Sequence, residues 1–129
     1  MRASKRFRHD TSSVPQARRF VTRFLAESGV ESQDLAEMMV SELATNCLLH
    51  TGSDFTVSLE QRGHRLRVEV SDQGEGRPVL RPTDPTSVSG RGLRAIDILS
   101  DSWGVDTRPD SRGKTVWFTL NVPPLAREA

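Results

Sequence analysis

The first half of the chain contains two segments in which apolar residues recur every three or four positions. The first begins at Ser12 or Ser13, either of which can cap a helix that takes Pro15 in its first turn. It ends at Ser28 and Gly29. Its apolar face consists of Val14, Ala17, Phe20, Val21, Phe24 and Leu25. This spacing predicts an amphipathic helix from about residue 13 to residue 28.

The second segment is longer, and it is predicted to be a helix from a cap at Ser32 to about His50. On one face, Glu42, Asn46 and His50 follow each other at intervals of four, so their side chains lie one above another. Such a trio is also common on a solvated helix, and His50 is compatible with packing or C-terminal capping. The neighbouring stripe, predicted to be buried, consists of Val40, Leu43, Ala44, Cys47 and Leu48.

Four later segments alternate between apolar and polar residues, which is typical of strands with one buried face. They are residues 55–60, 65–72, 103–108 and 114–120. Turns at residues 61–64 and 109–113 join them into two hairpins, and a third helix is expected at about residues 92–100. Strands paired as hairpins, with helices set apart from them, predict an α+β fold. We expect a two-layer α/β sandwich whose mixed or antiparallel sheet is covered by helices on one face.

The length of 129 residues is sufficient for one domain. Residues 1–11 are predicted to be a flexible basic tail, because charged chain ends are usually poorly ordered. The domain then covers residues 12–122, and residues 123–129 form a C-terminal tail. The basic residues of the N-terminal segment are Arg2, Lys5, Arg6 and Arg8.

The net charge is +1, with 18 Lys and Arg against 17 Asp and Glu, so charge gives no indication of direct binding to nucleic acid or a membrane. Cys47 is the single cysteine, which excludes an internal disulfide and a Cys-based zinc site and fits a reducing compartment. No apolar run approaches the roughly 18 residues of a membrane span, and no signal-peptide core follows the basic start. A cytoplasmic location is therefore expected.

Residues 72–93 contain almost no apolar residues but many glycines and prolines. This stretch opens with the sequence DQGEG, which begins at Asp72, and closes with the sequence GRGL, which ends at Leu93. Glycines let backbone N–H groups approach a ligand closely, and a helix N-terminus attracts anions. The stretch is therefore a candidate phosphate cradle with a lid; the alternative is an ordinary long surface loop. Neither a P-loop nor a G-x-G-x-x-G dinucleotide motif is present.

Four separated elements carry a family resemblance when they are taken in chain order. They are the helix face with Glu42 and Asn46, the DQGEG segment, the GRGL segment, and the sequence GKT at residues 113–115. Together they resemble the ATP-binding domain shared by gyrase, Hsp90, histidine kinases and MutL, the Bergerat fold. They are most similar to stand-alone anti-sigma factor serine kinases of the RsbW and SpoIIAB type, particularly to short actinobacterial versions with GRGL and GKTVWF. The resemblance covers roughly residues 12–121.

The resemblance implies ATP and Mg²⁺ as cofactors. Asn46 would help to hold Mg²⁺ through its side-chain oxygen, and Glu42 would accept a proton from an attacking serine hydroxyl or water near the γ-phosphate. Backbone N–H groups at the start of the third helix would close over the phosphates. The residues concerned are Gly90, Arg91, Gly92 and Leu93.

At the base end of the nucleotide, the resemblance implies that Asp72 accepts a hydrogen bond from the adenine amino group. Gly74 and Gly76 would let the backbone pass under the base and sugar, and Thr115 would add a hydroxyl contact near adenine. Simpler structural roles remain open: Asp72 as a strand-end turn former and Thr115 as a residue with high β-propensity.

The function that the resemblance implies is an ATP-dependent anti-sigma regulatory factor. It would phosphorylate a serine or threonine on a STAS-domain anti-anti-sigma partner, sequester a sigma factor, and act as a homodimer. Arg18 lies where the sporulation-type relatives present an arginine on their first helix, so its face is the candidate docking surface.

Two alternatives remain open. Val88 stands where the sporulation-type kinases carry an arginine ahead of the lid glycines, although Arg91 lies close enough in sequence to substitute for it. This departure favours an ATP-binding module that sequesters a partner with little phosphoryl transfer. A histidine-kinase catalytic domain is disfavoured, because the sequence has no helical dimerisation segment with a phosphoacceptor histidine.

Overall fold

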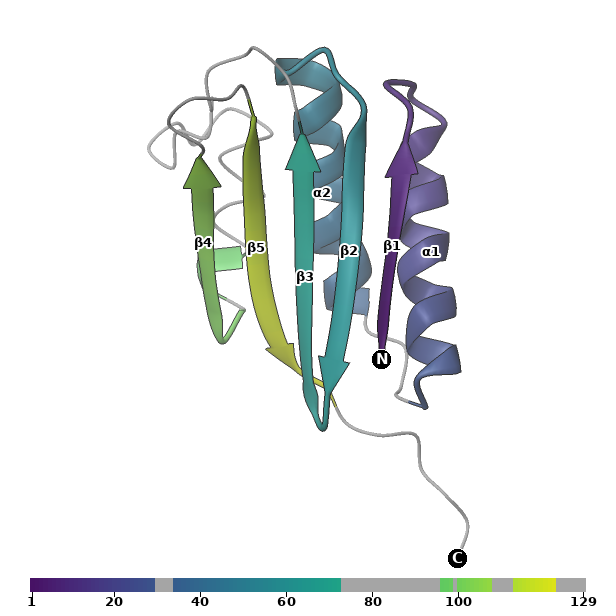
Figure 1. Ribbon diagram of the computed structural model, residues 1–129, viewed down its shortest axis with the longest axis vertical. Helices are drawn as coiled ribbons and strands as arrows, with labels where there is room; N and C mark the ends of the chain where they lie inside the picture. Colours follow the sequence, from purple (N-terminus) through teal and green to yellow (C-terminus); the bar gives the residue numbers. More distant parts are fainter. Residues whose placement is uncertain (30–33, 73–95, 99, 108–112, 123–129) are drawn as a thin grey trace, which may run out of the picture.

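The computed structural model describes residues 1–29, 34–72, 96–98, 100–107 and 113–122. One antiparallel five-stranded sheet has the strand order β1-β2-β3-β5-β4, and α1 and α2 cover one of its faces (Figure 1). This arrangement confirms the predicted α+β two-layer fold. The elements are β1 (Arg2–Phe7), α1 (Ser13–Glu27), α2 (Asp34–His50), β2 (Phe55–Arg62), β3 (Arg65–Asp72), β4 (Ser102–Thr107) and β5 (Lys114–Asn121).

Helix α1 forms where the apolar spacing predicts it. Ser12 is the N-cap residue but makes no side-chain capping bond, whereas the hydroxyl of Ser13 donates to the carbonyl oxygen of Arg8 at 2.7 Å. The helix ends at Ser28, and Gly29 follows with a φ of 73°, a left-handed conformation that glycine adopts without steric cost. The buried apolar residues of α1 are Ala17, Val21, Phe24 and Leu25.

Helix α2 packs against α1 and against β3. Asp34 and Glu37 lie in its first turn, where negative charge is favourable. The expected cap, Ser32, lies outside the described residues, as does the side chain of His50. The predicted stripe is buried at Val40, Leu43, Ala44 and Cys47, and Leu48 is partly buried against the same core.

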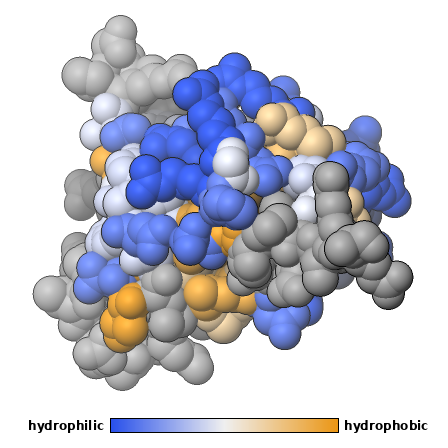
Figure 2. Space-filling view, turned by 90° about the horizontal axis from the view of Figure 1, so that it is seen from below, coloured by the Kyte–Doolittle hydropathy of each residue, from blue (hydrophilic) through white to orange (hydrophobic). Residues whose placement is uncertain are grey.

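The core is a layer of apolar side chains between the two helices and the sheet. Alternation along β2, β3 and β5 directs every second residue toward the helices, and each fully buried side chain of this kind contributes about 1.5–3 kcal/mol. The end of the molecule that carries the β2–β3 turn is largely hydrophilic, with hydrophobic residues in small areas (Figure 2). The buried strand residues of the layer include Val57, Leu59, Leu66, Val68, Val70, Val116, Phe118 and Leu120.

The N-terminal residues form strand β1, so the prediction of a flexible tail over residues 1–11 was wrong. The strand pairs with β2, from Arg2 opposite Glu60 to Phe7 opposite Phe55. Phe7 is 2% exposed and stacks on Phe55 with ring centroids 5.4 Å apart. Arg2 also forms an ion pair with Glu60, with 2.5 Å between Nε and Oε2. The buried ring of Phe7 and the backbone hydrogen bonds to β2 thus hold this segment in the sheet. Its charged residues look like those of a solvated tail, but charged residues are also common on edge strands.

β4 and β5 pair antiparallel as predicted, with Gly104 opposite Trp117, and residues 109–112 of the predicted turn lie outside the described residues. A Cβ atom added at Gly104 would lie 2.8 Å from the Trp117 ring, so the ring would have to move to admit any larger residue. The indole N–H of Trp103 donates to Oδ1 of Asp97 at 2.9 Å, which joins β4 to the short helical stretch at residues 96–98.

Several predicted features lie outside the described residues. They are most of the third helix, expected at residues 92–100, and the C-terminal tail, expected at residues 123–129. Within the part of the chain that the structure describes, no helix is long and apolar enough to cross a membrane.

A Phe7→Ala variant tests whether β1 belongs to the folded core. We expect a loss of about 3–5 kcal/mol in the free energy of unfolding, because a buried aromatic side chain disappears and leaves a cavity beside Phe55. Urea unfolding followed by circular dichroism measures the change. The control is Arg8→Ala, which alters an exposed side chain and should change stability by less than about 0.5 kcal/mol. Equal stability of the two variants would contradict the role given to β1.

Candidate functional site

Three elements bring polar residues together at one end of the sheet. Asp72 is the last residue of β3, Lys114 is the first residue of β5, and the two stand opposite each other in the antiparallel register. The C-terminal half of α2, with Glu42 and Asn46, lies behind the sheet toward the same end (Figure 1). The end of β3, the start of β5 and this part of α2 are called the α2–β3–β5 corner below.

Two side chains on this part of α2 contain buried polar atoms that have no hydrogen-bond partner among the residues that the structure describes. Asn46 is 5% exposed, and within this part of the chain neither its side-chain nitrogen nor its side-chain oxygen has a partner. The same is true of Oε2 of Glu42, one helical turn earlier. An unpaired buried polar atom costs about 1–3 kcal/mol, and native structures rarely contain one without a reason. The corner therefore offers hydrogen-bonding groups that the described residues do not use and that a ligand, an ion or ordered water can bind.

These groups suit Mg²⁺ that arrives together with phosphate. Magnesium prefers hard oxygen ligands, keeps several waters, and commonly takes only one or two protein oxygens beside the phosphates. Asn46 offers an amide oxygen, and Glu42 offers a carboxylate oxygen. Among the residues that the structure describes, no three His, Cys, Asp or Glu side chains form a metal-binding group. The donor set thus fits a cation shared with a ligand better than a cation held by the protein alone.

Asp72 forms a buried ion pair with Lys114. The ammonium nitrogen of Lys114 donates to Oδ2 of Asp72 at 2.8 Å, and the two side chains are only 9% and 2% exposed. Removing both charges from water carries a large desolvation penalty, which their mutual attraction offsets. Asp72 was predicted to be a site residue, but Lys114 was missed. The signal was the alternation of β5, which places Lys114 on the same face as Val116 and Phe118, where a solvated lysine would not lie.

Cys47 links the ion pair to helix α2. Burial, and to a smaller extent the negative charge of Asp72, raise the pKa of the Cys47 thiol to about 12, while the positive charge of Lys114 acts in the opposite direction. Both charges therefore lie close to the residue that follows Asn46. With this pKa the thiol stays protonated at neutral pH, so Cys47 is a packing residue and not a nucleophile.

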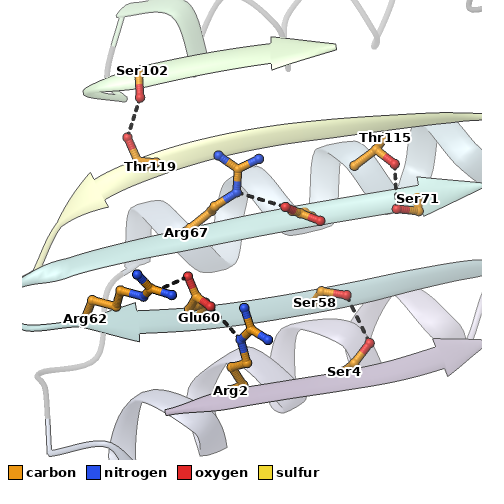
Figure 3. A network of polar contacts seen from close by, with 11 residues as sticks. Arg2, Ser4, Ser58, Glu60, Arg62, Arg67, Ser71, Ser102, Thr115 and Thr119 are labelled. Carbon is orange, nitrogen blue, oxygen red and sulfur yellow. Dashed lines mark hydrogen bonds and ion pairs between the residues drawn. The ribbon is translucent and has the colours of Figure 1, made fainter. Parts of the chain in front are cut away.

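Thr115 lies on the other face of the sheet. Its hydroxyl is within 2.8 Å of the hydroxyl of Ser71, its partner across the β3–β5 ladder, on the face that the helices leave open (Figure 3). Successive strand residues point to opposite faces, so Thr115 points away from the face that carries Lys114 and Asp72. The structure therefore does not place Thr115 beside Asp72, and the expected contact near adenine does not fit this geometry.

The glycine-rich part of the expected site lies outside the described residues. This applies to the residues expected at the base and sugar, Gly74 and Gly76, and to Val88. It also applies to the residues expected over the phosphates: Gly90, Arg91, Gly92 and Leu93.

Arg18 is exposed on α1, which lies beside β1 and apart from β3 and β5 (Figure 1). It lines a shallow depression between α1 and the start of α2, next to Thr22 and Glu37, whose side chains are hydrogen-bonded to each other. Arg18 is thus not brought together with the α2–β3–β5 corner.

A second depression, of about 530 Å³, lies on the open face across β1, β2 and β3. Its polar groups are already paired, as Arg67 with Glu69 at 2.8 Å and Ser4 with Ser58 at 2.9 Å (Figure 3). Arg67 also lies over the ring of Trp117, with Cζ 4.3 Å from the ring centroid. The α2–β3–β5 corner is the better candidate site, because it contains buried polar atoms that have no hydrogen-bond partner among the described residues.

A family model for the histidine kinase-like ATPase domain matches residues 7–120. The chain belongs to this family. Membership implies that the protein binds ATP. Comparison with curated proteins gives no match.

Several solved structures share the fold. A structure of the RsbU and RsbW domains of a Mycobacterium tuberculosis protein matches all of this chain and 34% of its own, with a TM-score of 0.73 and 18% identity. The histidine kinase domain of a blue-light activated kinase from Erythrobacter litoralis matches 68% of this chain and 43% of its own, with a TM-score of 0.54 and 25% identity. The histidine kinase AdeS of Acinetobacter baumannii matches 92% of this chain and 67% of its own, with a TM-score of 0.55 and 11% identity. This chain thus spans about a third of the first structure and less than half of the second.

Replacement of Asn46 by leucine should stabilise the ligand-free protein. The variant removes two buried unpaired polar atoms at nearly constant volume, so we expect the free energy of unfolding to rise by about 1–2 kcal/mol. The control is Thr45→Val, since the hydroxyl of Thr45 donates to the carbonyl oxygen of Ser41 at 2.7 Å and its loss should cost about 0.5–1 kcal/mol. Chemical denaturation of both variants measures the difference. A destabilised Asn46→Leu variant would mean that the Asn46 amide is satisfied in the native protein.

Proposed function

We propose that the protein is an ATP-dependent anti-sigma regulatory factor with serine/threonine kinase activity. It phosphorylates a STAS-domain anti-anti-sigma partner and sequesters a sigma factor. The observation that carries this proposal is the buried side chain of Asn46 together with the buried Oε2 of Glu42, which have no hydrogen-bond partner among the described residues of this histidine kinase-like ATPase domain. The regulatory role is supported by the motif resemblance to RsbW-type kinases and by the fold shared with a structure that contains RsbU and RsbW domains.

Glu42 is the proposed general base. The oxygen of the partner's hydroxyl attacks the γ-phosphorus, the bond to the oxygen that bridges the β- and γ-phosphates breaks, and ADP leaves. The hydroxyl proton passes to the carboxylate of Glu42. Glu42 as a whole is half-buried, but the burial of its Oε2 atom supports this role, because a base in a water-poor site interacts more strongly with the reacting groups.

Asn46 is the proposed protein ligand of Mg²⁺, through its side-chain oxygen. When bound, the ion supplies positive charge that offsets the charge of the phosphates. The N–H groups of the Gly90–Leu93 segment are proposed to complete the phosphate site.

Asp72 is the proposed acceptor for the adenine amino group, and Gly74 and Gly76 are proposed to lie against the base and sugar. A carboxylate can only accept hydrogen bonds, so it favours the amino group of adenine over the carbonyl oxygen of guanine. The burial of Asp72 supports this role, since a shielded acceptor discriminates more strongly than a solvated one.

The exposed basic side of α1 is the proposed docking surface for the protein partner. Arg18, Arg19 and Arg23 are all exposed there, and they would attract an acidic surface. The proposal includes a homodimer in the cytoplasm, as the resemblance implies.

A second candidate function is nucleotide-gated sequestration of a partner with little phosphoryl transfer. It is favoured by Val88, an apolar residue where the sporulation-type kinases carry an arginine. Transfer depends on positive charge around the γ-phosphate, so this departure affects turnover more than ATP binding.

Calorimetry of ATP binding with and without Mg²⁺ tests the nucleotide site. We expect wild type to bind with Mg²⁺, Asp72→Ala to lose at least about tenfold in affinity, and Asn46→Ala to lose most of the dependence on Mg²⁺. Thr115→Ala is the matched control, because Thr115 lies on the opposite face of the sheet and its variant should bind as wild type does. No binding by the wild-type protein would refute the ATP-dependent function.

Transfer of labelled phosphate to a purified STAS-domain protein tests the kinase activity. Glu42→Gln should retain ATP binding and lose about 10²–10⁴-fold in transfer rate, because the amide cannot accept the proton. Glu69→Gln, which changes a glutamate on the open face, should transfer at the wild-type rate. Wild-type transfer by Glu42→Gln would overturn the role of Glu42. ATP binding without transfer by any form would favour sequestration, and acid-labile phosphate on the chain itself would indicate a histidine kinase.

A further inference from the structure

Strand β1 is an edge of the sheet, and among the described residues no strand pairs with its outer side. We propose that this outer side of β1 is a docking site for an extended acidic segment of a partner protein. The segment adds a strand to the sheet and places carboxylates opposite Arg2 and Arg6. Strand β2 separates β1 from the α2–β3–β5 corner, and the inference does not depend on ATP binding or on phosphoryl transfer.

The hydrogen bonds between β1 and β2 show which backbone groups of β1 face outward. The amino nitrogen of Met1 donates to the carbonyl oxygen of Gln61 at 3.1 Å, and the N–H of Gln61 donates to the carbonyl oxygen of Met1 at 2.9 Å. Opposite residues of an antiparallel ladder alternate between this bonded arrangement and an unbonded one. The backbone groups of Arg2, Ser4 and Arg6 therefore point away from β2, where they match the donors and acceptors of an added strand.

The side chains of the same three residues lie on the open face of the sheet. The hydroxyl of Ser4 is 2.9 Å from that of Ser58 there, and Arg2 lies on the same face (Figure 3). Arg6 follows on this face because alternate strand residues share a side. An added strand places its own residues directly opposite these, so two acidic residues at positions i and i+4 meet the two guanidinium groups.

The ion pairs within the chain leave both arginines accessible. Arg2 contacts Glu60, a carboxylate that Arg62 also contacts, so two guanidinium groups share one negative charge. Arg6 contacts Asp54 at 3.2 Å. The side chains of Arg2 and Arg6 are nevertheless 76% and 71% exposed, and a guanidinium group has five N–H donors. Each arginine therefore has donors left for the carboxylate of a partner.

The helix side of β1 has room for a side chain of the added strand. A depression of about 260 Å³ lies there, between the strand and the start of α1. Alternate residues of an added strand point to this side of the sheet. The charged residues that line the depression are Lys5, Arg6, Arg8 and Asp10, so positive charge prevails here as well.

The same geometry disfavours other occupants. In an antiparallel pair of two copies centred on Ser4, Arg2 of one copy would lie opposite Arg6 of the other, and like charges directly opposite each other destabilise a sheet. A nucleic acid or an anionic lipid surface would neutralise the guanidinium groups, but it offers no row of donors to the outward-facing carbonyl oxygens. An acidic strand satisfies both the charges and the backbone.

A short capped peptide with the central sequence Glu-Val-Thr-Val-Glu tests the required charges. Its glutamates have the i and i+4 spacing, and its threonine can lie opposite Ser4. We expect the full chain to bind it saturably by calorimetry, with NMR shifts at the backbone amides of residues 2–6. Replacement of both glutamates of the peptide by glutamine should weaken binding about five- to tenfold, because two cross-strand ion pairs are lost.

The matching protein variant is Arg2→Gln/Arg6→Gln, which should weaken binding of the glutamate peptide to a similar extent. Its control is Arg62→Gln/Arg65→Gln, which removes the same charge from two exposed residues beside the β2–β3 turn and should bind as wild type does.

N-methylated peptides separate strand addition from simple charge attraction. A methyl group on the threonine nitrogen removes a hydrogen bond to the outward-facing backbone of β1, so the affinity should fall about tenfold. A methyl group on a valine nitrogen, which points away from the sheet, should leave the affinity unchanged. Both measurements use the wild-type protein, so they decide the question even where the arginine variants do not fold.

The other results would each overturn the inference. They are no binding of the glutamate peptide, equal affinity of the glutamate and glutamine peptides, and equal weakening by the two methyl positions. Binding of single-stranded DNA or of phosphatidylserine vesicles without peptide binding would indicate a polyanion site instead. Shifts of the same amides with protein concentration alone would indicate that a second copy occupies the edge. A protein that binds ATP and transfers phosphate but does not bind the peptide would refute this inference and leave the proposed function intact.

Discussion

The antiparallel register between β3 and β5 is the constraint on which the α2–β3–β5 corner depends. It places Asp72 opposite Lys114 on the helix-covered face, and it is held by the burial of Val116 and Phe118 further along β5. A slip of one residue would turn Lys114 to the open face and break its ion pair with Asp72. The apolar layer thus fixes the position of the charges, although it contributes no chemistry of its own.

The α2–β3–β5 corner also contains polar atoms that lower the free energy of unfolding of the protein. Other polar side chains of the described residues have partners, as Ser71 does in Thr115 and Ser13 does in the backbone of Arg8. On α2, however, Glu42 and Asn46 hold buried polar atoms that have no partner in the part of the chain that the structure describes. Local departures of this kind from an otherwise consistent structure are expected at functional sites.

Most of the fold could be predicted from the sequence, because periodicity reports which side of an element is buried. The spacing of Ala17, Val21 and Phe24 predicted α1, and the alternation of apolar and polar residues predicted the strand pairs β2–β3 and β4–β5. β1 was missed because its anchor is a single buried residue, Phe7, in a segment that otherwise looks like a solvated basic tail.

The site was harder to predict, because its chemistry depends on contacts across the sheet. Glu42, Asn46 and Asp72 stood out by resemblance and lie at one corner, but a motif does not say which face of a strand a residue occupies. The resemblance assigned a role to Thr115 in the sequence GKT. Successive residues of β5 point to opposite faces of the sheet, however, so Lys114 bonds Asp72 on one face and Thr115 lies beside Ser71 on the other. Family membership then supports ATP binding.

The two tryptophans give the protein an intrinsic fluorescence signal at two different places in the sheet. Trp117 is sandwiched between Gly104 and the guanidinium of Arg67, so its emission follows the integrity of the sheet. Trp103 is hydrogen-bonded to Asp97, just beyond the glycine-rich stretch, so its emission should follow any rearrangement of that stretch. A single-tryptophan form that keeps Trp103 would therefore give a fluorescence signal for nucleotide engagement without any attached dye.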